Sequence, residues 1–282
     1  MQDSIKKADI LIEALPYIQA FAGKTIVVKY GGSALESPAV VKGILQDLVF
    51  LSTVGLRPVL IHGGGQEISK RLASMGKATA FIQGMRVTDR ATIQVVNEAL
   101  EEVNQKLVDS VRALGGAAEG LVVHDRVLHA EPHPGATQLG YVGSVKEVHV
   151  AKLRRVLERS AIPVLSPVGS RDGQLYNINA DEAASMVAAS VHAEKLVLLT
   201  NVRGILRHPG DPGSLIPTLT IKEAKLLLER KVIQEGMIPK VNACIAALRG
   251  GVKKTHIIDA TISHALLLEI FTKTGIGTEL IR

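Results

Sequence analysis

The sequence has few of the residues that mark several common classes of protein. Its 282 residues include one cysteine, no tryptophan and only 3% aromatic residues. A single cysteine, Cys244, excludes an intrachain disulfide and a cysteine zinc cluster. So few aromatic side chains cannot build the stacking platforms of a single-strand nucleic-acid binder. No apolar run approaches the roughly 18 residues that a membrane-spanning helix needs, so we expect no contact with a membrane.

The charge is modest and spread along the chain. Lysine and arginine number 33 against 27 acidic residues, which gives +6, and no segment concentrates the positive charge. We therefore expect no nucleic-acid partner, whereas small anionic ligands suit such a field. The acidic residues Asp3, Asp9 and Glu13 are unlike a secretory or transit peptide, so we expect a reducing, cytoplasmic location.

Short β-branched blocks alternate with amphipathic segments along most of the chain. The pattern predicts strands at 25–30, 57–62, 162–168, 195–202 and 255–259, and helices at 37–51, 89–114, 148–159, 181–191, 221–231 and 239–248. Residues 121–130 predict a hairpin or two short strands, followed by a loop to 143. The fold class is therefore α/β, a mostly parallel open sheet with helices on both faces.

Residues 3–20 form a helical pattern before the first strand. Ile5, Ala8, Ile12 and Leu15 make one apolar stripe, and Pro16 should kink or end the helix. We expect this stripe to pair with another subunit, and packing on its own domain is the alternative. The domain division that follows is a helix for oligomerisation at 1–22, one lobe at 23–172 and a second at 173–282, separated at the turn-rich residues 169–173.

Two glycine turns follow the first two strands. Lys29 and Gly31-Gly32 end the first, and Gly63-Gly64-Gly65 follows the second. The carboxyl edge of such a sheet is where ligands bind, and bare backbone N–H groups there can hold an anion. Tight turns without a ligand are the alternative. The sequence lacks G-x-S-x-G, and Ile68 breaks a G-x-G-x-x-G pattern from Gly63, so neither a hydrolase nor a dinucleotide fold is expected.

Three charged residues lie close to predicted helix starts. Asp181 is either a functional carboxylate or merely a first-turn helix acid. Lys240 is electrostatically awkward at a helix start unless an anion comes to it. Arg86 precedes a helix and suits a bidentate grip on a carboxylate, although an isolated arginine is usually just solvated.

Six motifs in a fixed order resemble the amino acid kinase family. The likeness runs from about residue 5 to residue 281, and it rests on Lys29-Tyr30-Gly31-Gly32, His62-Gly63-Gly64-Gly65, Gly84 to Asp89, Asn177 to Asp181, Leu198 to Gly204 and Gly236 to Asn242. The resemblance implies a three-layer, two-lobed α/β sandwich with the acceptor and dimer contacts in the first lobe and ATP in the second. Within the family, the chain is most similar to enzymes that phosphorylate the γ-carboxylate of N-acetyl-L-glutamate with ATP, in arginine biosynthesis.

The resemblance also implies a role for each matching residue. Lys29 and Lys240 would approach the transferring phosphoryl, and Asp181 would hold both ammonium groups. Such a transfer asks the protein mainly for alignment and charge neutralisation. Mg²⁺ would be held mainly by the phosphate oxygens of ATP, without a protein metal site. The remaining roles are phosphate binding by Gly31 and Gly32, acceptor binding by Gly64, Gly65, Arg86 and Asn177, and ATP binding by Thr200, Asn201, Gly204 and Lys240.

The end of the chain is similar to the arginine-inhibited, hexameric branch of the family. The resemblance implies an allosteric arginine site, a hexamer built from dimers and, as a further partner, a PII-type signalling protein; its arginine-binding residues would be Lys195, His264, Glu269, Gly275 and Gly277. Glu269 could pair with a guanidinium, and Lys195 and the glycine turn with a carboxylate, or Glu269 could be a solvated helix acid. Asn201 stands where most relatives have aspartate, which leaves the role of that side chain open.

Two other functions stay open. A kinase for a longer acceptor, such as N-acetylaminoadipate, differs by one methylene, which changes binding by only about 1 to 3 kcal/mol. A binding module without catalysis would keep the fold, although the intact Lys29, Asp181 and Lys240 argue against it.

Overall fold

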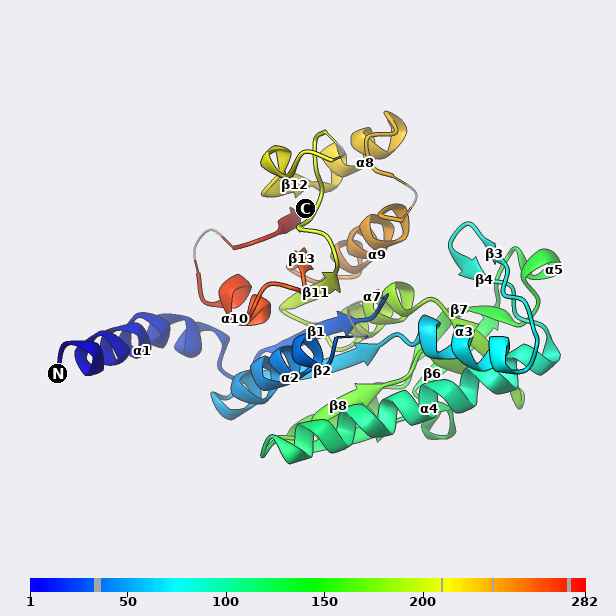
Figure 1. Ribbon diagram of the computed structural model, residues 1–282, viewed down its shortest axis with the longest axis horizontal. Coiled ribbons are helices and arrows are strands. Elements are labelled where there is room, and N and C mark those ends of the chain that lie inside the picture. Colours follow the sequence, from blue (N-terminus) through cyan, green and yellow to red (C-terminus); the bar gives the residue numbers. More distant parts are fainter. Residues whose placement is uncertain (33–36, 209, 235, 273–274) are drawn as a thin grey trace.

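An eight-stranded, mostly parallel sheet forms the centre of the molecule (Figure 1). The computed structural model describes residues 1–32, 37–208, 210–234, 236–272 and 275–282. Within this sheet, β13 and β14 are the one antiparallel pair among the described residues, and the other neighbouring strands pair parallel. The strand order is β12 (Thr218–Thr220), β14 (Thr278–Ile281), β13 (Lys254–Asp259), β11 (Lys195–Thr200), β1 (Thr25–Tyr30), β2 (Arg57–His62), β8 (Ile162–Leu165) and β5 (Ala118–Leu121). The predicted fold class is confirmed.

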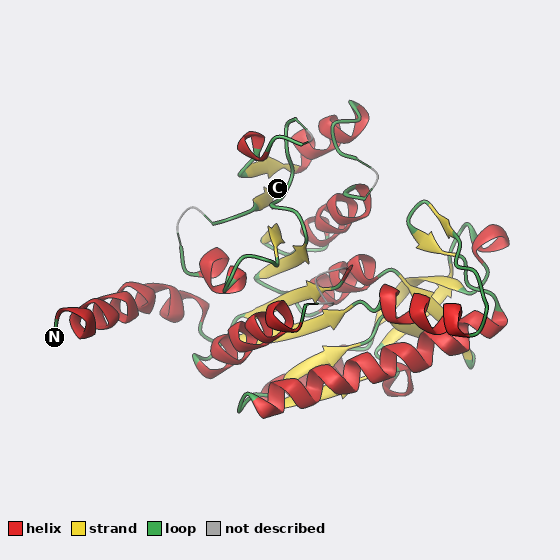
Figure 2. Cartoon of the chain, viewed as in Figure 1, coloured by secondary structure: helices red, strands yellow, loops and turns green. Residues whose placement is uncertain are grey.

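Helices cover both faces of the sheet, so the molecule has three layers (Figure 2). On one face lie α2 (Pro38–Thr53), α4 (Arg90–Ala113) and α10 (Ala265–Ile270); on the other lie α6 (Val150–Glu158), α7 (Ala180–Ser190), α8 (Ile221–Glu229) and α9 (Ile238–Arg249). Strand alternation sends Ile26 and Val28 to the first core and Val27 to the second. Local signals start the helices: Ser37 and Asp89 accept hydrogen bonds from the first turns of α2 and α4.

A small closed barrel stands beside the main sheet, and the sequence did not predict it. It comprises β6 (Leu128–Pro132), β7 (Val142–Val148), β9 (Val168–Arg171) and β10 (Gln174–Ile178). Of the two alternatives predicted for 121–130, the hairpin is wrong and the two short strands are confirmed. β5 pairs in the main sheet and β6 in the barrel, with the 3-10 turn η2 (Val123–Asp125) between them. The expected loop to 143 contains α5 (Ala136–Leu139) and the start of β7.

Further boundaries differ from the predicted ones. The predicted strand 162–168 is two strands, β8 and β9, and the predicted helix 148–159 starts at Val150 because β7 runs to Val148. The predicted turn at 169–173 is mostly strand, because β9 extends to Arg171 and only residues 172–173 form the tip of the β9–β10 hairpin. The proposed lobe boundary therefore falls within a pair of hydrogen-bonded strands. The predicted strand 195–202 ends at Thr200.

Helix α1 (Gln2–Phe21) projects away from the layers, with the N-terminus at its far end (Figure 1). The helix continues through Pro16, so the prediction that it could end there is wrong. Its apolar side chains are exposed: Ile5 at 53%, Ile12 at 67% and Leu15 at 43%. Remaining elements are α3 (Gly65–Ser74), the hairpin β3 (Phe81–Ile82) with β4 (Met85–Arg86), and η3 (Pro212–Ser214). In the part of the chain that the structure describes, no helix has the length and apolarity to cross a membrane.

Candidate functional site

The two glycine turns meet at the carboxyl edge of β1 and β2, as their positions in the sequence predicted. A Cβ built on Gly31 would lie 3.1 Å from Gly63 Cα, so a side chain there would crowd the second turn and glycine favours this close approach. The Gly63 N–H donates to the Tyr30 carbonyl at 2.7 Å, which fastens the second turn to the first strand. Gly32 has a φ of +76°, in the left-handed region that favours glycine. The pair therefore forms one rigid edge between the strands.

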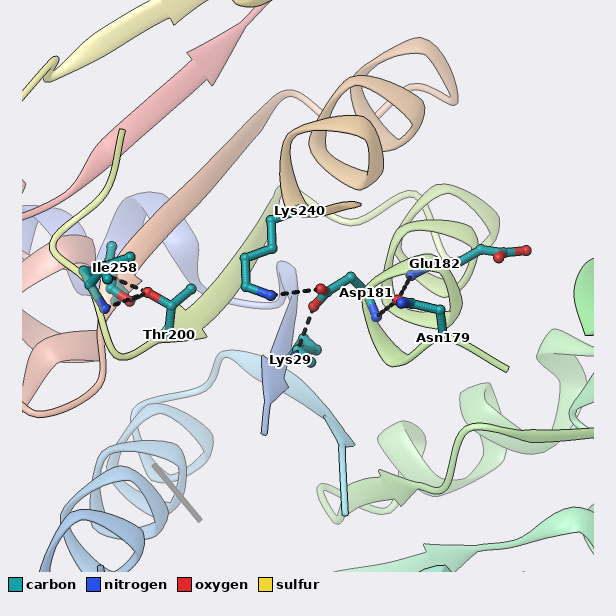
Figure 3. A network of polar contacts seen from close by, with 8 residues as sticks. Lys29, Asn179, Asp181, Glu182, Thr200, Lys240 and Ile258 are labelled. Atoms are coloured by element: carbon teal, nitrogen blue, oxygen red, sulfur yellow. Dashed lines mark hydrogen bonds and ion pairs between the residues drawn. The ribbon is translucent and has the colours of Figure 1, made fainter. Parts of the chain in front are cut away.

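Lys29, Asp181 and Lys240 come together at this edge from three separate elements (Figure 3). Lys29 Nζ lies 2.9 Å from Asp181 Oδ1, and Lys240 Nζ lies 3.0 Å from Asp181 Oδ2. The carboxylate side chain is 6% exposed, and the two lysine side chains are 9% and 21% exposed. The lysine in the first turn of α9 thus has its anion, and Asp181 is more than a helix acid.

Asp181 is held ionised by its two partners. Burial alone would raise the pKa of its carboxyl, but the charges of Lys29 and Lys240 outweigh that cost and keep the pKa below its usual range. Asn179 caps α7 instead: its side-chain oxygen accepts from the backbone N–H of Asp181 and Glu182. Because Asn179 does the capping, the Asp181 carboxylate is available to the lysines.

A cleft extends from this trio toward the β3–β4 hairpin. One cavity of about 330 Å³ is lined by Lys29, Asp181 and Gly32, and an adjoining one of about 140 Å³ reaches Asn177. The two share the Gly63–Gly65 turn and Arg86, with Phe81 from β3 over them. The predicted Gly64, Gly65, Arg86 and Asn177 therefore line one continuous space. Phe81 and Asn179 also line it and were not predicted from the sequence.

Arg86 is buried in this cleft without a carboxylate partner among the described residues. It is 6% exposed, and its guanidinium donates to the Gly65 carbonyl at 2.6 Å, to Ser69 Oγ at 2.9 Å and to Thr79 Oγ1 at 3.2 Å. It also stacks over the Phe81 ring, 4.8 Å from the centroid. Burial lowers the pKa of Arg86. Since a buried cation gains most from an anion, the arrangement favours a carboxylate ligand.

Asn177 and Gly64 are fixed by their neighbours. The Asn177 side-chain amide donates to Thr88 Oγ1 at 3.2 Å, which holds it at the wall of the cleft. A Cβ on Gly64 would lie 2.5 Å from Leu100 Cδ2 of α4, so a larger residue there would have to move the Leu100 side chain or the turn.

A second cavity, of about 410 Å³, lies on the other side of the trio. Its lining includes Thr200, Asn201, Gly204 and Lys240, the four residues predicted to bind ATP, together with the segment Val232–Ile233. The Thr200 hydroxyl is already engaged, since it donates to the Val202 carbonyl at 2.7 Å and accepts from its N–H. A Cβ on Gly204 would lie 2.5 Å from Thr278 Oγ1. Both residues shape the loop, and Lys240 links this cavity to the cleft.

Glu269 is buried next to β13 and is not a solvated acid. Its Oε1 lies 2.6 Å from His256 Nδ1, and its Oε2 accepts from the Ile276 N–H at 2.8 Å. Burial opposes ionisation, but these contacts keep the pKa of Glu269 below its usual range. The ammonium of Lys195, also buried, lies over the Phe21 ring at the end of α1. His256 was not among the residues predicted from the sequence.

The other predicted regulatory residues have structural partners. Gly275 has a φ of +61°, and a Cβ there would lie 2.8 Å from Glu269 Oε1, so this turn wraps the carboxylate. His264 does not contact Glu269. It lies at the start of α10, and its Nδ1 is 2.6 Å from Oδ1 of Asp47 in α2. Gly277 packs against the Ile257 carbonyl, where a Cβ would lie at 2.2 Å.

Comparison with known proteins identifies relatives over nearly the whole chain. Residues 24–259 match the model of the amino acid kinase family. A protein named acetylglutamate kinase from Nostoc sp. is 48% identical over 279 residues, 98% of this chain and 94% of its own. The protein of the same name from Caldanaerobacter subterraneus subsp. tengcongensis is 46% identical over 98% of this chain and 93% of its own.

Solved structures show the same architecture. N-acetylglutamate synthase from Neisseria gonorrhoeae, solved with coenzyme A and N-acetyl-glutamate, superposes with a TM-score of 0.85 at 29% identity. The match covers 96% of this chain and 62% of the synthase chain. Carbamate kinase from Giardia lamblia bound to AMP-PNP superposes with a TM-score of 0.69 at 15% identity over 93% of this chain and 99% of its own, a likeness of fold alone.

Proposed function

The chain belongs to the amino acid kinase family, and we propose that it transfers the γ-phosphoryl group of ATP to the side-chain carboxylate of N-acetyl-L-glutamate, a step of arginine biosynthesis. The relatives that align over nearly their full length are named for this activity. The observation that carries the proposal in the structure is the Lys29–Asp181–Lys240 trio, which joins two cavities at one buried junction.

The trio fits phosphoryl transfer because it supplies positive charge without a group that must gain or lose a proton. Transfer to a carboxylate spreads negative charge over the equatorial and leaving oxygens, which two ammonium groups can neutralise. Asp181 holds Lys29 and Lys240 in place before the ligands arrive. The N–H groups of Gly31, Gly32, Gly64 and Gly65 then bind the phosphoryl group and the attacking carboxylate. The product is an acyl phosphate, with no covalent enzyme intermediate.

The nucleotide occupies the cavity lined by Thr200, Asn201 and Gly204, with its phosphates toward Lys240. No group of three His, Cys, Asp or Glu side chains within the described residues is arranged to hold a metal ion. We therefore propose that Mg²⁺ enters with ATP and is held mainly by phosphate oxygens.

The acceptor occupies the cleft on the other side of the trio. Its α-carboxylate pairs with Arg86, the buried cation without an acidic partner among the described residues, and its amide end contacts Asn177. Its side-chain carboxylate then reaches the glycine turns and Lys29. The small size of the cleft, cavities of about 330 and 140 Å³, suits a single amino-acid derivative.

A steady-state assay tests the proposal. ADP release is coupled to NADH oxidation, with N-acetylglutamate, N-acetylaminoadipate, aspartate or carbamate as the acceptor, and hydroxylamine traps the acyl phosphate. We expect N-acetylglutamate to give the highest kcat/KM. A preference for the longer acceptor would replace the substrate, and ADP release without acyl hydroxamate would contradict the transfer.

Inhibition by arginine is a further part of the proposal. Buried Glu269, wrapped by the turn at Gly275, offers a carboxylate for a guanidinium, and Lys195 offers a cation for the α-carboxylate. In this proposal His264, at the start of α10, acts through its contact with Asp47 of α2. Gly277 allows the close approach to the Ile257 carbonyl that positions β14, the strand after the turn. A cytoplasmic location remains a prediction.

We also propose that the chain forms a hexamer, built from dimers, through α1. The exposed Ile5, Ile12 and Leu15 give this projecting helix an apolar face that a second subunit would cover. A PII-type signalling protein is a further proposed partner. Deleting residues 1–20 and measuring the mass in solution tests the hexamer: the expected result is a smaller assembly, and an unchanged number of subunits would refute the role of α1.

A further inference from the structure

His62 ends β2 directly before the glycine turn and is completely buried. None of the roles above uses it. Its Nδ1 lies 2.8 Å from the Gly63 carbonyl oxygen, and its Nε2 lies 3.1 Å from the side-chain nitrogen of Asn104. Asn104, 2% exposed, comes from the middle of α4 on the covering layer. A polar chain of two buried side chains thus leads from α4 to the turn.

The chemistry of the partners fixes the proton of His62. Asn104 Nδ2 donates to the Val164 carbonyl at 2.8 Å, and since a carbonyl can only accept, the amide must present its nitrogen on this side. The second hydrogen of that nitrogen faces His62 Nε2, which is therefore the bare acceptor. The imidazole proton is then on Nδ1, from where it donates to the Gly63 carbonyl.

The charge of His62 is fixed in the same way. A second proton would bring an N–H of Nε2 against the N–H of Asn104. Burial lowers the pKa of His62 to about 4, although the bond to Gly63 acts in the opposite direction. Near pH 7, His62 is therefore neutral: it donates from Nδ1 to Gly63 and accepts at Nε2 from Asn104. With both ring nitrogens engaged in this way, it does not act as an acid or base toward a substrate.

The Gly63 carbonyl belongs to the same peptide unit as the Gly64 N–H. The described chain has no cis peptide bond, so the two groups point in opposite directions. Gly63 is also held on its other side, where its N–H donates to Tyr30. The Gly64 N–H itself donates to no protein group that the structure describes, and Gly64 lines the acceptor cleft. By fixing the Gly63 carbonyl, His62 therefore sets the direction of the Gly64 N–H, a donor without a partner among the described residues.

We propose that His62 and Asn104 are positioning residues, which orient the Gly63–Gly64 peptide so that the Gly64 N–H meets the charge that develops during phosphoryl transfer. This inference rests on the proposed function and adds two residues to it. Neither side chain touches a ligand. Pre-set donors are effective because they need no reorganisation during the reaction.

A matched pair of substitutions tests the proposal. His62→Asn keeps a donor, because Nδ2 of asparagine lies three bonds from Cα, as Nδ1 of histidine does; His62→Leu removes it. Removing one such donor from an active site lowers kcat by about 10²–10³-fold. In His62→Leu the Gly64 N–H is still present but is no longer held in one orientation. We therefore expect this variant to lower kcat by about 10- to 100-fold, with the KM for ATP unchanged. His62→Asn should restore at least half of that loss on a logarithmic scale.

Variants on α4 separate positioning from packing. Asn104→Leu leaves His62 in place but frees its Nε2, and we expect it to lower kcat by about tenfold, with the same KM pattern. Asn97→Leu makes the same change on the same helix and serves as the control, because the Asn97 amide donates to Glu101 and has no other bond among the described residues. Equal losses in His62→Asn and His62→Leu, or in the two α4 variants, would overturn the proposal.

The tautomer gives a readout that does not depend on activity. In wild-type protein labelled with ¹⁵N at histidine, we expect the His62 proton on Nδ1 and no titration of this ring between pH 8 and 5. A proton on Nε2, or kcat unchanged in His62→Leu, would refute the inference. Failure of the proposed function would look different: a wild type that phosphorylates none of the acceptors, with the Nδ1 proton still in place.

Discussion

Replacing Asp181 by asparagine should lower both the stability of the fold and kcat. Binding of a nucleotide should restore part of the lost stability. The substitution keeps the shape of the side chain and one oxygen but removes its charge. Two ammonium groups, at 2.9 and 3.0 Å, then face each other with no anion between them. In the wild type both lysine–carboxylate ion pairs are shielded from solvent, because the Asp181 side chain is only 6% exposed.

The magnitude follows from these distances. Each pair at about 3 Å contributes about 5 kcal/mol of attraction at an effective dielectric constant of about 20, before desolvation is subtracted. Removing one partner of a buried ion pair typically costs about 3 to 5 kcal/mol of unfolding free energy. At about 2 °C per kcal/mol for a chain of this size, Asp181→Asn should melt roughly 6 to 10 °C lower. Its kcat should fall about 10²–10³-fold, because the lysines lose their alignment.

Calorimetry with and without a non-hydrolysable ATP analogue is the assay. The phosphates bring negative charge to the lysines, so the variant should gain more from saturating analogue than the wild type does. Glu182→Gln is the control on the same turn of α7, since Glu182 bonds the Val145 N–H and not the lysines. An unchanged Tm in Asp181→Asn, or equal gains from the analogue in both proteins, would refute the reasoning.

Four further predictions concern single side chains. Lys29→Ala and Lys240→Ala should lower kcat by about 10²–10³-fold and change the KM for the acceptor much less, in the coupled assay; an unchanged kcat would remove that lysine from the site. Arg86→Ala should raise the KM for the acceptor and leave ATP affinity intact, since a grip away from the reacting atoms is equal in ground and transition states; titration calorimetry showing lost ATP binding would contradict this. The fold lowers the pKa of His62 from 6.5 to about 4, so the free energy of unfolding is highest above pH 6.5 and falls as the pH falls toward 4. Over that window, the unfolding free energy of His62→Asn, measured in urea, should fall by about 3 kcal/mol less than that of the wild type. Equal falls in the two proteins would refute this prediction. Glu269→Ala should abolish arginine inhibition while basal kcat stays the same; equal inhibition in both proteins would reject the regulatory site.

The trio shows what a sequence can predict about a site. Lys240 in the first turn of a helix is unfavourable on its own, and that conflict correctly predicted an anion nearby. The glycine turns were predictable because both follow apolar strands, and parallel strands end at one edge. The identity of the anion as Asp181 could come only from the family resemblance, since residues 59 positions apart meet through the packing of α7 on α9.

The barrel and the partner of Glu269 could not be predicted for a different reason. Strands β9 and β10 have four and five residues with glycines around them, too short for a period to emerge. His256 reaches Glu269 because β13 pairs with β11 in one register, opposite Val197, on the face that α10 covers. Register between distant strands depends on the whole sheet, and nothing local to His256 specifies it.

The double pairing of Asp181 also bears on which solutes can block the empty site. Two lysines alone would attract inorganic phosphate or sulfate from the surrounding solution. With the carboxylate between them, the trio has a net charge of only one, and both ammonium groups are already engaged. A simple anion must compete with Asp181 and brings few other contacts, whereas a nucleotide bound as proposed would also fill the cavity beyond Lys240. We therefore expect inorganic phosphate and sulfate to bind weakly at the free site, because Asp181 already neutralises part of the charge of the two lysines.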